Sequence, residues 1–241
     1  MKKEIEVKFN DLEWLYSPNW EYFDYGNCKR HLQVIMPYSK KGLEKKYPVI
    51  FYITGAACTK CFMESEKKCP HYEKLKPLTD AMDEADVIIL ASPVYVYHVT
   101  GAMKTFLDHY GYRWMVHRPK ESMFRKQGVC ISTAAGAGMK PTNKDMADSL
   151  FFWGVAKRYQ YGVRVAAVNW NGVSEKKKCA IDKATSGIAK KIVNNSKHVK
   201  PGIKTRAMFW AMHFAQRKGF NPCDAEYWKS KGWTGKKRPW K

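Results

Sequence analysis

Three short apolar segments, each followed by an amphipathic helical pattern, constrain the fold of this chain more than any other feature. Continuous runs of this kind are typical of strands buried on both faces, and they are Val87–Ala91, Gly128–Ser132 and Val163–Val168. Apolar residues spaced by three and four predict the helices that follow, at residues 101–110, 142–151 and 174–192. Strands and helices that alternate in this way predict crossover connections and a parallel sheet, and hence an α/β fold.

Further signals extend this pattern toward the N-terminus and set the helix boundaries. Residues 48–53 read as a fourth parallel strand, and residues 72–84 as a helix. Thr100 and Ser174 stand where N-caps are expected. Thr142 and Asp145 have the spacing of a capping box, with Asp in place of Glu, which predicts a helix start at Thr142.

Composition divides the chain into three parts: an atypical strand-containing segment (1–56), an α/β core (57–195) and a basic aromatic tail (196–241). The formal charge is +21, and residues 184–241 carry 14 basic and 2 acidic residues, which is +12 of the total.

No apolar run reaches the roughly 18 residues that span a bilayer, and the first residues lack a signal-peptide pattern. Seven cysteines in a chain of 241 residues do not suggest a disulfide scaffold, so we expect a cytoplasmic protein with reduced thiols.

Two loops follow the predicted strands at the edge where open parallel sheets bind ligands. Residues 92–101 combine a rigid Pro93 with Tyr95 and Tyr97, and residues 133–138 contain no bulky side chain. A planar ligand could approach the backbone of the second loop closely. The loops together predict a slot with aromatic and amide walls, although the residue types alone equally fit two ordinary turns.

The motif Ser-Pro-Val-Tyr after the strand at 87–91, followed by Gly101-Ala-Met-Lys-Thr-Phe-Leu-Asp108, resembles the flavodoxin-like NAD(P)H-dependent FMN reductases. The resemblance runs from about Cys58 to about Asn194. It implies a flavodoxin-like three-layer sandwich with a mostly parallel central sheet. It further implies an FMN cofactor, NAD(P)H as reductant, a small-molecule or protein electron acceptor, and a homo-oligomer.

The same resemblance implies which residues border the flavin ring. They are Ser92, Pro93, Val94, Tyr95, Val96, Tyr97, Thr133, Ala134, Ala135, Gly136 and Gly138. Hydride transfer belongs to the flavin itself, so no side chain is predicted to act as a general acid or base.

The N-terminal part departs from that family. Its members begin with a strand and a Ser- and Gly-rich loop that binds the FMN phosphate at a helix N-terminus, and no such loop precedes Cys58. Residues 22–57 instead resemble the opening strands of α/β-hydrolase esterases, but the chain has no Gly-x-Ser-x-Gly nucleophile elbow. Our hypothesis is that two unlike pieces join near residue 57. The alternative function is therefore a flavodoxin-like binding protein that has lost the phosphate loop and binds an anionic partner through its tail.

Three cysteines lie close together, at Cys58, Cys61 and Cys69, and His71 follows them. Iron–sulfur clusters generally take four thiolates, and Glu64 stands where another cysteine would be expected, so we predict no cluster. Zinc bound by the three cysteines and His71 has a workable ligand count but a tight Cys69-x-His71 spacing. Reduced cysteines in a loop beside the flavin are the favoured interpretation, and no metal site is predicted.

The tail alternates aromatic and basic residues, especially over 203–216 and 227–241. Single-stranded nucleic acid, an anionic membrane surface and an acidic redox partner are three partners that fit this composition. The favoured interpretation is that the aromatic residues pack on the core or on a second subunit while the lysines stay solvated. His213, within the apolar stretch, is expected to be packed rather than a ligand.

Overall fold

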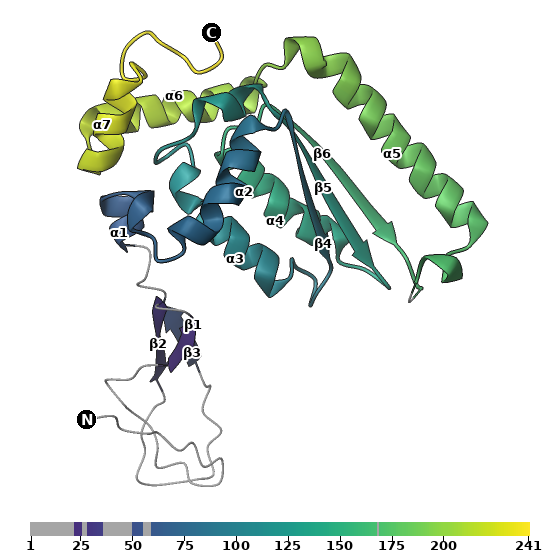
Figure 1. The fold of residues 1–241 in the computed structure, drawn as a ribbon. Helices are drawn as coiled ribbons and strands as arrows, with labels where there is room; N and C mark the ends of the chain where they lie inside the picture. The colour runs from purple at the N-terminus through teal and green to yellow at the C-terminus, as the bar shows by residue number, and fades with distance from the viewer. Residues whose placement is uncertain (1–21, 26–27, 36–49, 55–58, 168) are drawn as a thin grey trace, which may run out of the picture. The chain divides into compact units, whose positions relative to one another are not determined.

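The computed structural model describes residues 22–25, 28–35, 50–54, 59–167 and 169–241 (Figure 1). They fall into two compact units, Met1–Glu73 and Lys74–Lys241. Among the described helices, none combines the length and apolar character needed to cross a membrane.

The first unit contains a small antiparallel sheet. Its strands, in the order β1-β2-β3, are β1 (Tyr22–Tyr25), β2 (Cys28–Ile35) and β3 (Ile50–Thr54), and two short helices follow, α1 (Thr59–Met63) and η2 (Glu66–Lys68). Strands β2 and β3 pair in register from His31↔Thr54 to Ile35↔Ile50. The prediction of a fourth parallel strand at residues 48–53 is therefore wrong, although a strand is present. An apolar run indicates burial but does not determine the direction of the neighbouring strand.

The rest of the chain has an α/β fold around a parallel sheet of order β4-β5-β6. Its longer elements are α2 (Tyr72–Glu84), β4 (Val87–Pro93), α3 (Gly101–His109), β5 (Gln127–Ala134), α4 (Met139–Phe152), β6 (Lys157–Arg164), α5 (Glu175–Asn195), α6 (Ile203–Lys218) and α7 (Pro222–Ser230). Its 3-10 helices are η3 (Gly111–Arg113), η4 (Glu121–Arg125), η5 (Trp170–Gly172) and η6 (Ser196–His198). The register runs without interruption, with Ile88 beside Gly128 and Gly128 beside Arg158. The predicted α/β class and parallel sheet are confirmed.

Several predicted boundaries are confirmed and two are wrong. Helix α2 matches its prediction, and Thr100 caps α3 by accepting a hydrogen bond from the amide of Met103 at 3.2 Å. Helix α4 begins at Met139 instead of Thr142, because Gly138 at φ 99° turns the chain into the helix one turn earlier. Strand β6 begins at Lys157 instead of residue 163, since the polar sequence of its first half gives no apolar signal.

Helices cover both faces of the sheet, in three layers. Helices α2, α3 and α4 lie on one face and α5 runs along the other (Figure 1). The first face holds the main core, where Ile88, Leu90 and Cys130 pack with Leu150 of α4. Burial raises the pKa of the Cys130 thiol to about 12, so this cysteine is a protonated core residue.

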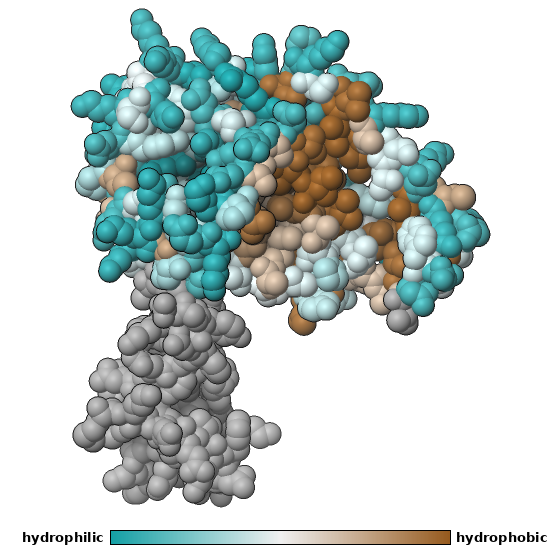
Figure 2. All heavy atoms as spheres, viewed as in Figure 1, coloured by the Kyte–Doolittle hydropathy of each residue, from teal (hydrophilic) through white to brown (hydrophobic). Residues whose placement is uncertain are grey.

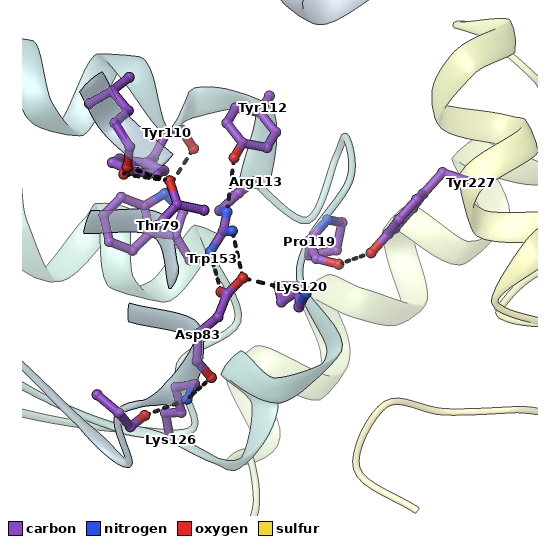
Figure 3. Close-up of polar contacts among 12 residues, drawn as sticks. Thr79, Asp83, Tyr110, Tyr112, Arg113, Pro119, Lys120, Lys126, Trp153 and Tyr227 are labelled. Carbon is purple, nitrogen blue, oxygen red and sulfur yellow. Dashed lines mark hydrogen bonds and ion pairs between the residues drawn. The ribbon is translucent and has the colours of Figure 1, made fainter. Parts of the chain in front are cut away.

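A buried polar network attaches the segment after α3 to α2 (Figure 3). The guanidinium of Arg113, 5% exposed, donates to both carboxylate oxygens of Asp83 at 2.6 and 3.0 Å. Lys126 Nζ donates to the carbonyl oxygen of Asp83 at 2.8 Å. Burial opposes ionisation of Asp83, but the hydrogen bond and charge of Arg113, assisted by Lys120, hold the pKa of Asp83 below its usual range. The network therefore keeps both charges paired where water is largely excluded.

The aromatic residues of the tail pack on the body of the second unit. Phe209, Trp228 and Trp233 form a buried cluster with Met115 and Phe124. Tyr227 Oη donates to the carbonyl oxygen of Pro119 at 2.7 Å (Figure 3), and His213 Nδ1 lies 2.6 Å from the carbonyl oxygen of Trp233. The favoured interpretation of the tail aromatics is confirmed for these residues, and His213 is packed as expected.

Candidate functional site

The candidate site lies at the carboxyl ends of β4 and β5, which meet at one edge of the sheet. The two predicted loops are held together there, because the amide of Val94 donates to the carbonyl oxygen of Thr133 at 2.8 Å. A Cβ atom placed on Gly138 would stand 2.6 Å from Val94 Cγ1 and 3.1 Å from Tyr97 Cα. Glycine is required at this position both by its φ of 99° and by the closeness of the neighbouring loop.

A strained turn forms the exposed rim of the first loop. Tyr95 and His98 exchange two backbone hydrogen bonds of 3.0 Å, and the two residues between them have positive φ, 48° at Val96 and 67° at Tyr97. A β-branched residue with positive φ is a genuine outlier, and such strain concentrates at ligand-binding sites. Tyr95 and Tyr97 are each 62% exposed and Val96 is 92% exposed. The turn thus presents apolar and aromatic surface that the described part of the chain does not bury.

Ser92, another predicted site residue, faces the interior. It is 3% exposed, and its hydroxyl accepts from the amide of Thr100 at 3.1 Å and donates to the carbonyl oxygen of Pro93 at 2.9 Å. Its side chain therefore fixes the path of the loop into α3. Pro93 itself is exposed at the end of β4.

The second loop supplies backbone in place of side chains. Thr133, Ala135 and Gly136 are exposed, and the Cβ position of Gly136 has no neighbour within 4 Å. Gly138 then leads into α4 without a side-chain cap, so the amides of the first turn have no partner within the helix. Thr142 Oγ1 donates to the carbonyl oxygen of Gly138 at 2.9 Å and secures this entry to the helix.

The structure adds a pair that the sequence analysis did not identify. His98 Nδ1 lies 3.0 Å from Asp145 Oδ2, and the same oxygen accepts from the amide of Val99 at 3.4 Å. Asp145 therefore attaches the first loop to α4, and the predicted capping role of Asp145 is wrong. The two residues are 47 positions apart, so spacing within one sequence gave no signal of their contact.

Part of the cysteine cluster lies outside the described residues, since Cys58 is not among them. Cys61 is buried in α1, and Cys69 is half-buried after η2. Over the described ranges, no three His, Cys, Asp or Glu side chains form a group that could hold a metal ion. A site that includes Cys58 stays untested.

The geometry of the two loops suits a planar ligand. The first loop exposes the aromatic side chains of Tyr95 and Tyr97, and the second consists of small residues whose backbone a flat ring can approach. Open α/β sheets bind ligands in this position, outside the carboxyl ends of the strands. The residues present therefore fit the ring of a flavin. The sequence before Cys58 lacks the Ser- and Gly-rich loop that would hold the flavin's phosphate.

Comparison with known proteins gives a consistent result. Residues 32–165 match the family model described as NADPH-dependent FMN reductase, which is more than half of the 241-residue chain. The match begins 26 residues before Cys58, within the segment that we compared with esterases. An iron-sulfur flavoprotein of Archaeoglobus fulgidus is 39% identical over 92 residues, which is 37% of this chain and 37% of that protein. The chain thus matches little more than a third of the length of this curated relative.

Two solved structures are similar over part of the chain. A flavone reductase superimposes with a TM-score of 0.42 at 16% identity, covering 54% of this chain and 50% of that one. An NADH:FMN oxidoreductase in its apo form superimposes with a TM-score of 0.37 at 22% identity, covering 55% of this chain and 64% of that one.

Proposed function

Because this chain belongs to the NADPH-dependent FMN reductase family, we propose that it is a flavin-dependent oxidoreductase that uses NAD(P)H to reduce FMN and passes the electrons to a second acceptor. The observation that carries the proposal is the contact of residues 94–97 with residues 133–138 at the carboxyl edge of the sheet. Bound FMN would supply the hydride chemistry, while the protein supplies position and electrostatics.

In this proposal each loop has a separate task. Tyr95 and Tyr97 provide exposed aromatic surface beside the ring, and the strained turn at Val96 holds them there. The backbone of Ala135 and Gly136 provides hydrogen-bonding groups for the polar edge of the ring. The contact between His98 and Asp145 keeps the turn attached to α4. No side chain is assigned as a general acid or base.

Anchoring of the phosphate is the weak element of this site. Backbone amides at a helix N-terminus and the helix dipole normally bind such a group, and the sequence before Cys58 has no Ser- and Gly-rich loop to do so. We therefore propose that FMN binds more weakly here than in a protein with that loop. The relative's name mentions an iron–sulfur cluster, but the absence of a cluster at Cys58, Cys61 and Cys69 remains our prediction.

A steric variant tests the proposed slot. Gly136→Phe places a ring in open space on the predicted ligand-facing loop, so the fold should persist while FMN is excluded. Gly202→Phe is the matched control, because its Cβ position is equally open and lies in a different loop. We expect the fluorescence of FMN to be quenched when it binds the wild-type chain. The affinity for FMN should fall about 10-fold or more in Gly136→Phe only, where 10-fold corresponds to about 1.4 kcal/mol of binding free energy.

The assay also distinguishes the alternative function. Flavin fluorescence titration measures binding, and NAD(P)H absorbance with added FMN measures turnover. A wild-type chain that neither retains FMN nor oxidises NAD(P)H would overturn the reductase proposal and leave the binding-protein alternative. Unchanged affinity in Gly136→Phe, or an equal loss in both glycine variants, would contradict the assignment of the ring to this loop.

A further inference from the structure

Helix α6 carries an apolar stripe on its outer face. Ile203, Trp210 and Phe214 are 86%, 43% and 57% exposed, and Ala207 between them is exposed too. The spacing of four, three and four residues places all of them on one side of the helix. Phe220, just beyond the helix, is 81% exposed. Exposed apolar side chains grouped in this way mark an interaction surface more often than scattered ones do.

Apart from Trp210, whose ring packs against Arg238, the stripe does not contribute to the packing of α6 on the protein. Thr205, Phe209, His213 and Gln216 form the buried side of the helix, and Phe209 belongs to the buried aromatic cluster with Trp228 and Trp233. The helix is therefore held by its inner side, and its outer side is open to a partner.

The surroundings of the stripe are strongly basic. Helix α6 has four exposed cations, Lys204, Arg206, Arg217 and Lys218, and no acidic residue. The guanidinium of Arg238 lies 4.2 Å from the centre of the Trp210 ring. The tail has only two acids, and one of them, Asp224, is 1% exposed and paired with Arg118. The apolar stripe thus lies in a positive field.

We propose that the outer face of α6 binds the surface of an anionic lipid bilayer. In this arrangement the helix lies in the plane of the interface, over about 24 Å at 1.5 Å per residue. Ile203 and Phe214 enter the boundary between headgroups and acyl chains, Trp210 lies at headgroup level, and the flanking cations meet the lipid phosphates. The proposal does not depend on the flavin site.

The composition of the stripe favours lipid over single-stranded nucleic acid. Bases bind by stacking on aromatic faces, but Ile203 and Ala207 offer none, and Arg238 covers one face of Trp210. An apolar face flanked by cations along one helix is characteristic of interfacial helices. Nucleic acid is therefore an outcome that the test must be able to reveal.

Sedimentation with lipid vesicles tests the proposal on the full chain. Vesicles of phosphatidylcholine alone are compared with vesicles that also contain phosphatidylglycerol. We compare an apolar double variant, Ile203→Ser with Phe214→Ser, and a charge double variant, Lys204→Gln with Lys218→Gln. The control is Val193→Ser, an apolar position on α5 that is 68% exposed, between Phe214 and Ile203. Thermal unfolding of each variant verifies the fold. If the apolar variant does not fold, the test of lipid binding rests on the charge variant alone.

The proposal requires binding to the anionic vesicles only, with a partition constant that falls about 10-fold or more in the charge variant. It also requires a similar loss in the apolar variant, weaker binding at high salt and no change in Val193→Ser. It is overturned if wild-type protein stays in solution with both vesicles, or if all variants bind alike. Light scattering that shows an oligomer dissociated by the apolar variant would identify a subunit interface instead. A single-stranded oligonucleotide that binds the wild type in place of lipid would equally overturn it.

Discussion

The two faces of the central sheet differ sharply in how they are packed. On the face covered by α2, α3 and α4, Ile88 and Leu90 are each 5% exposed and Leu150 is fully buried. On the face covered by α5, Ile89 is 61% exposed, although it stands between those two strand residues. None of the 21 residues of α5 is buried. One face therefore holds a close-packed core and the other is only partly covered.

The difference bears on the site as well as on stability. Figure 2 shows hydrophobic side chains gathered over the sheet beside α5, on a surface that is otherwise largely hydrophilic. The site loops are attached to the well-packed face, since they lead into α3 and α4. The candidate site thus depends on the helices that the core holds most firmly, and changes near α5 should leave it largely intact.

The largest effect is expected from a cavity in the well-packed face. Leu150→Ala removes a fully buried side chain that packs closely on Gly128, where an added Cβ would stand 2.7 Å from Leu150 Cδ1. We expect a loss of about 2–5 kcal/mol in the free energy of unfolding, measured by urea denaturation. Val193→Ala on α5 is the control and should change it by less than about 0.5 kcal/mol. Equal losses in the two variants would refute the contrast between the faces.

A smaller effect is expected from the polar network on the same side of the sheet. Asp83→Asn leaves the buried guanidinium of Arg113 without its counter-charge, which should destabilise the protein by about 1–3 kcal/mol near pH 7. Because the pKa of Asp83 is lowered in the folded state, its contribution is complete above the unfolded pKa of about 3.9. It is lost as the pH falls through the folded pKa. The gap between wild type and variant should therefore close below pH about 4, and a gap that stays constant to lower pH would contradict the assigned ion pair.

The features that sequence predicted well are those set by local patterns. The apolar run at Val87–Ala91 and the helical spacing after Thr100 each depend on neighbours within a few residues, and both are confirmed. The Ser-Pro-Val-Tyr loop could be assigned to a family from its motif alone, and the family match supports that assignment. The strand at Lys157–Arg164 was misplaced because its polar first half carries no such pattern.

Contacts between residues far apart in the sequence could not be predicted from local patterns. The pairing of His98 with Asp145 and that of Arg113 with Asp83 depend on how helices pack, and single residue types gave no indication of either. The direction of β3 likewise depends on its partner, β2, and not on its own apolar sequence. Whether the predicted flavin-contacting residues bind FMN stays a prediction that only a binding experiment can test.

The smallest effect is expected from Ile89→Thr, which together with Ile88→Thr compares the two faces most directly. Ile88 and Ile89 are neighbours on β4, so the same change to Thr keeps a β-branched residue in the same strand and differs only in the face it alters. Ile88→Thr should cost about 1–3 kcal/mol, because it places a hydroxyl in the core and leaves a small void. Ile89→Thr should change stability by less than about 0.5 kcal/mol, since that side chain is mostly exposed.

This pair also tests the open face itself. Urea unfolding of both variants at two protein concentrations separates intrinsic packing from association. If Ile89→Thr proves as costly as Ile88→Thr, the face beside α5 must be covered in solution. A cost that grows with protein concentration would then identify the cover as a second copy, because mass action makes the stability of an associating protein depend on its concentration. If Ile89→Thr lowers the free energy of unfolding only slightly at both concentrations, the face beside α5 is open in solution, as it is in the structure.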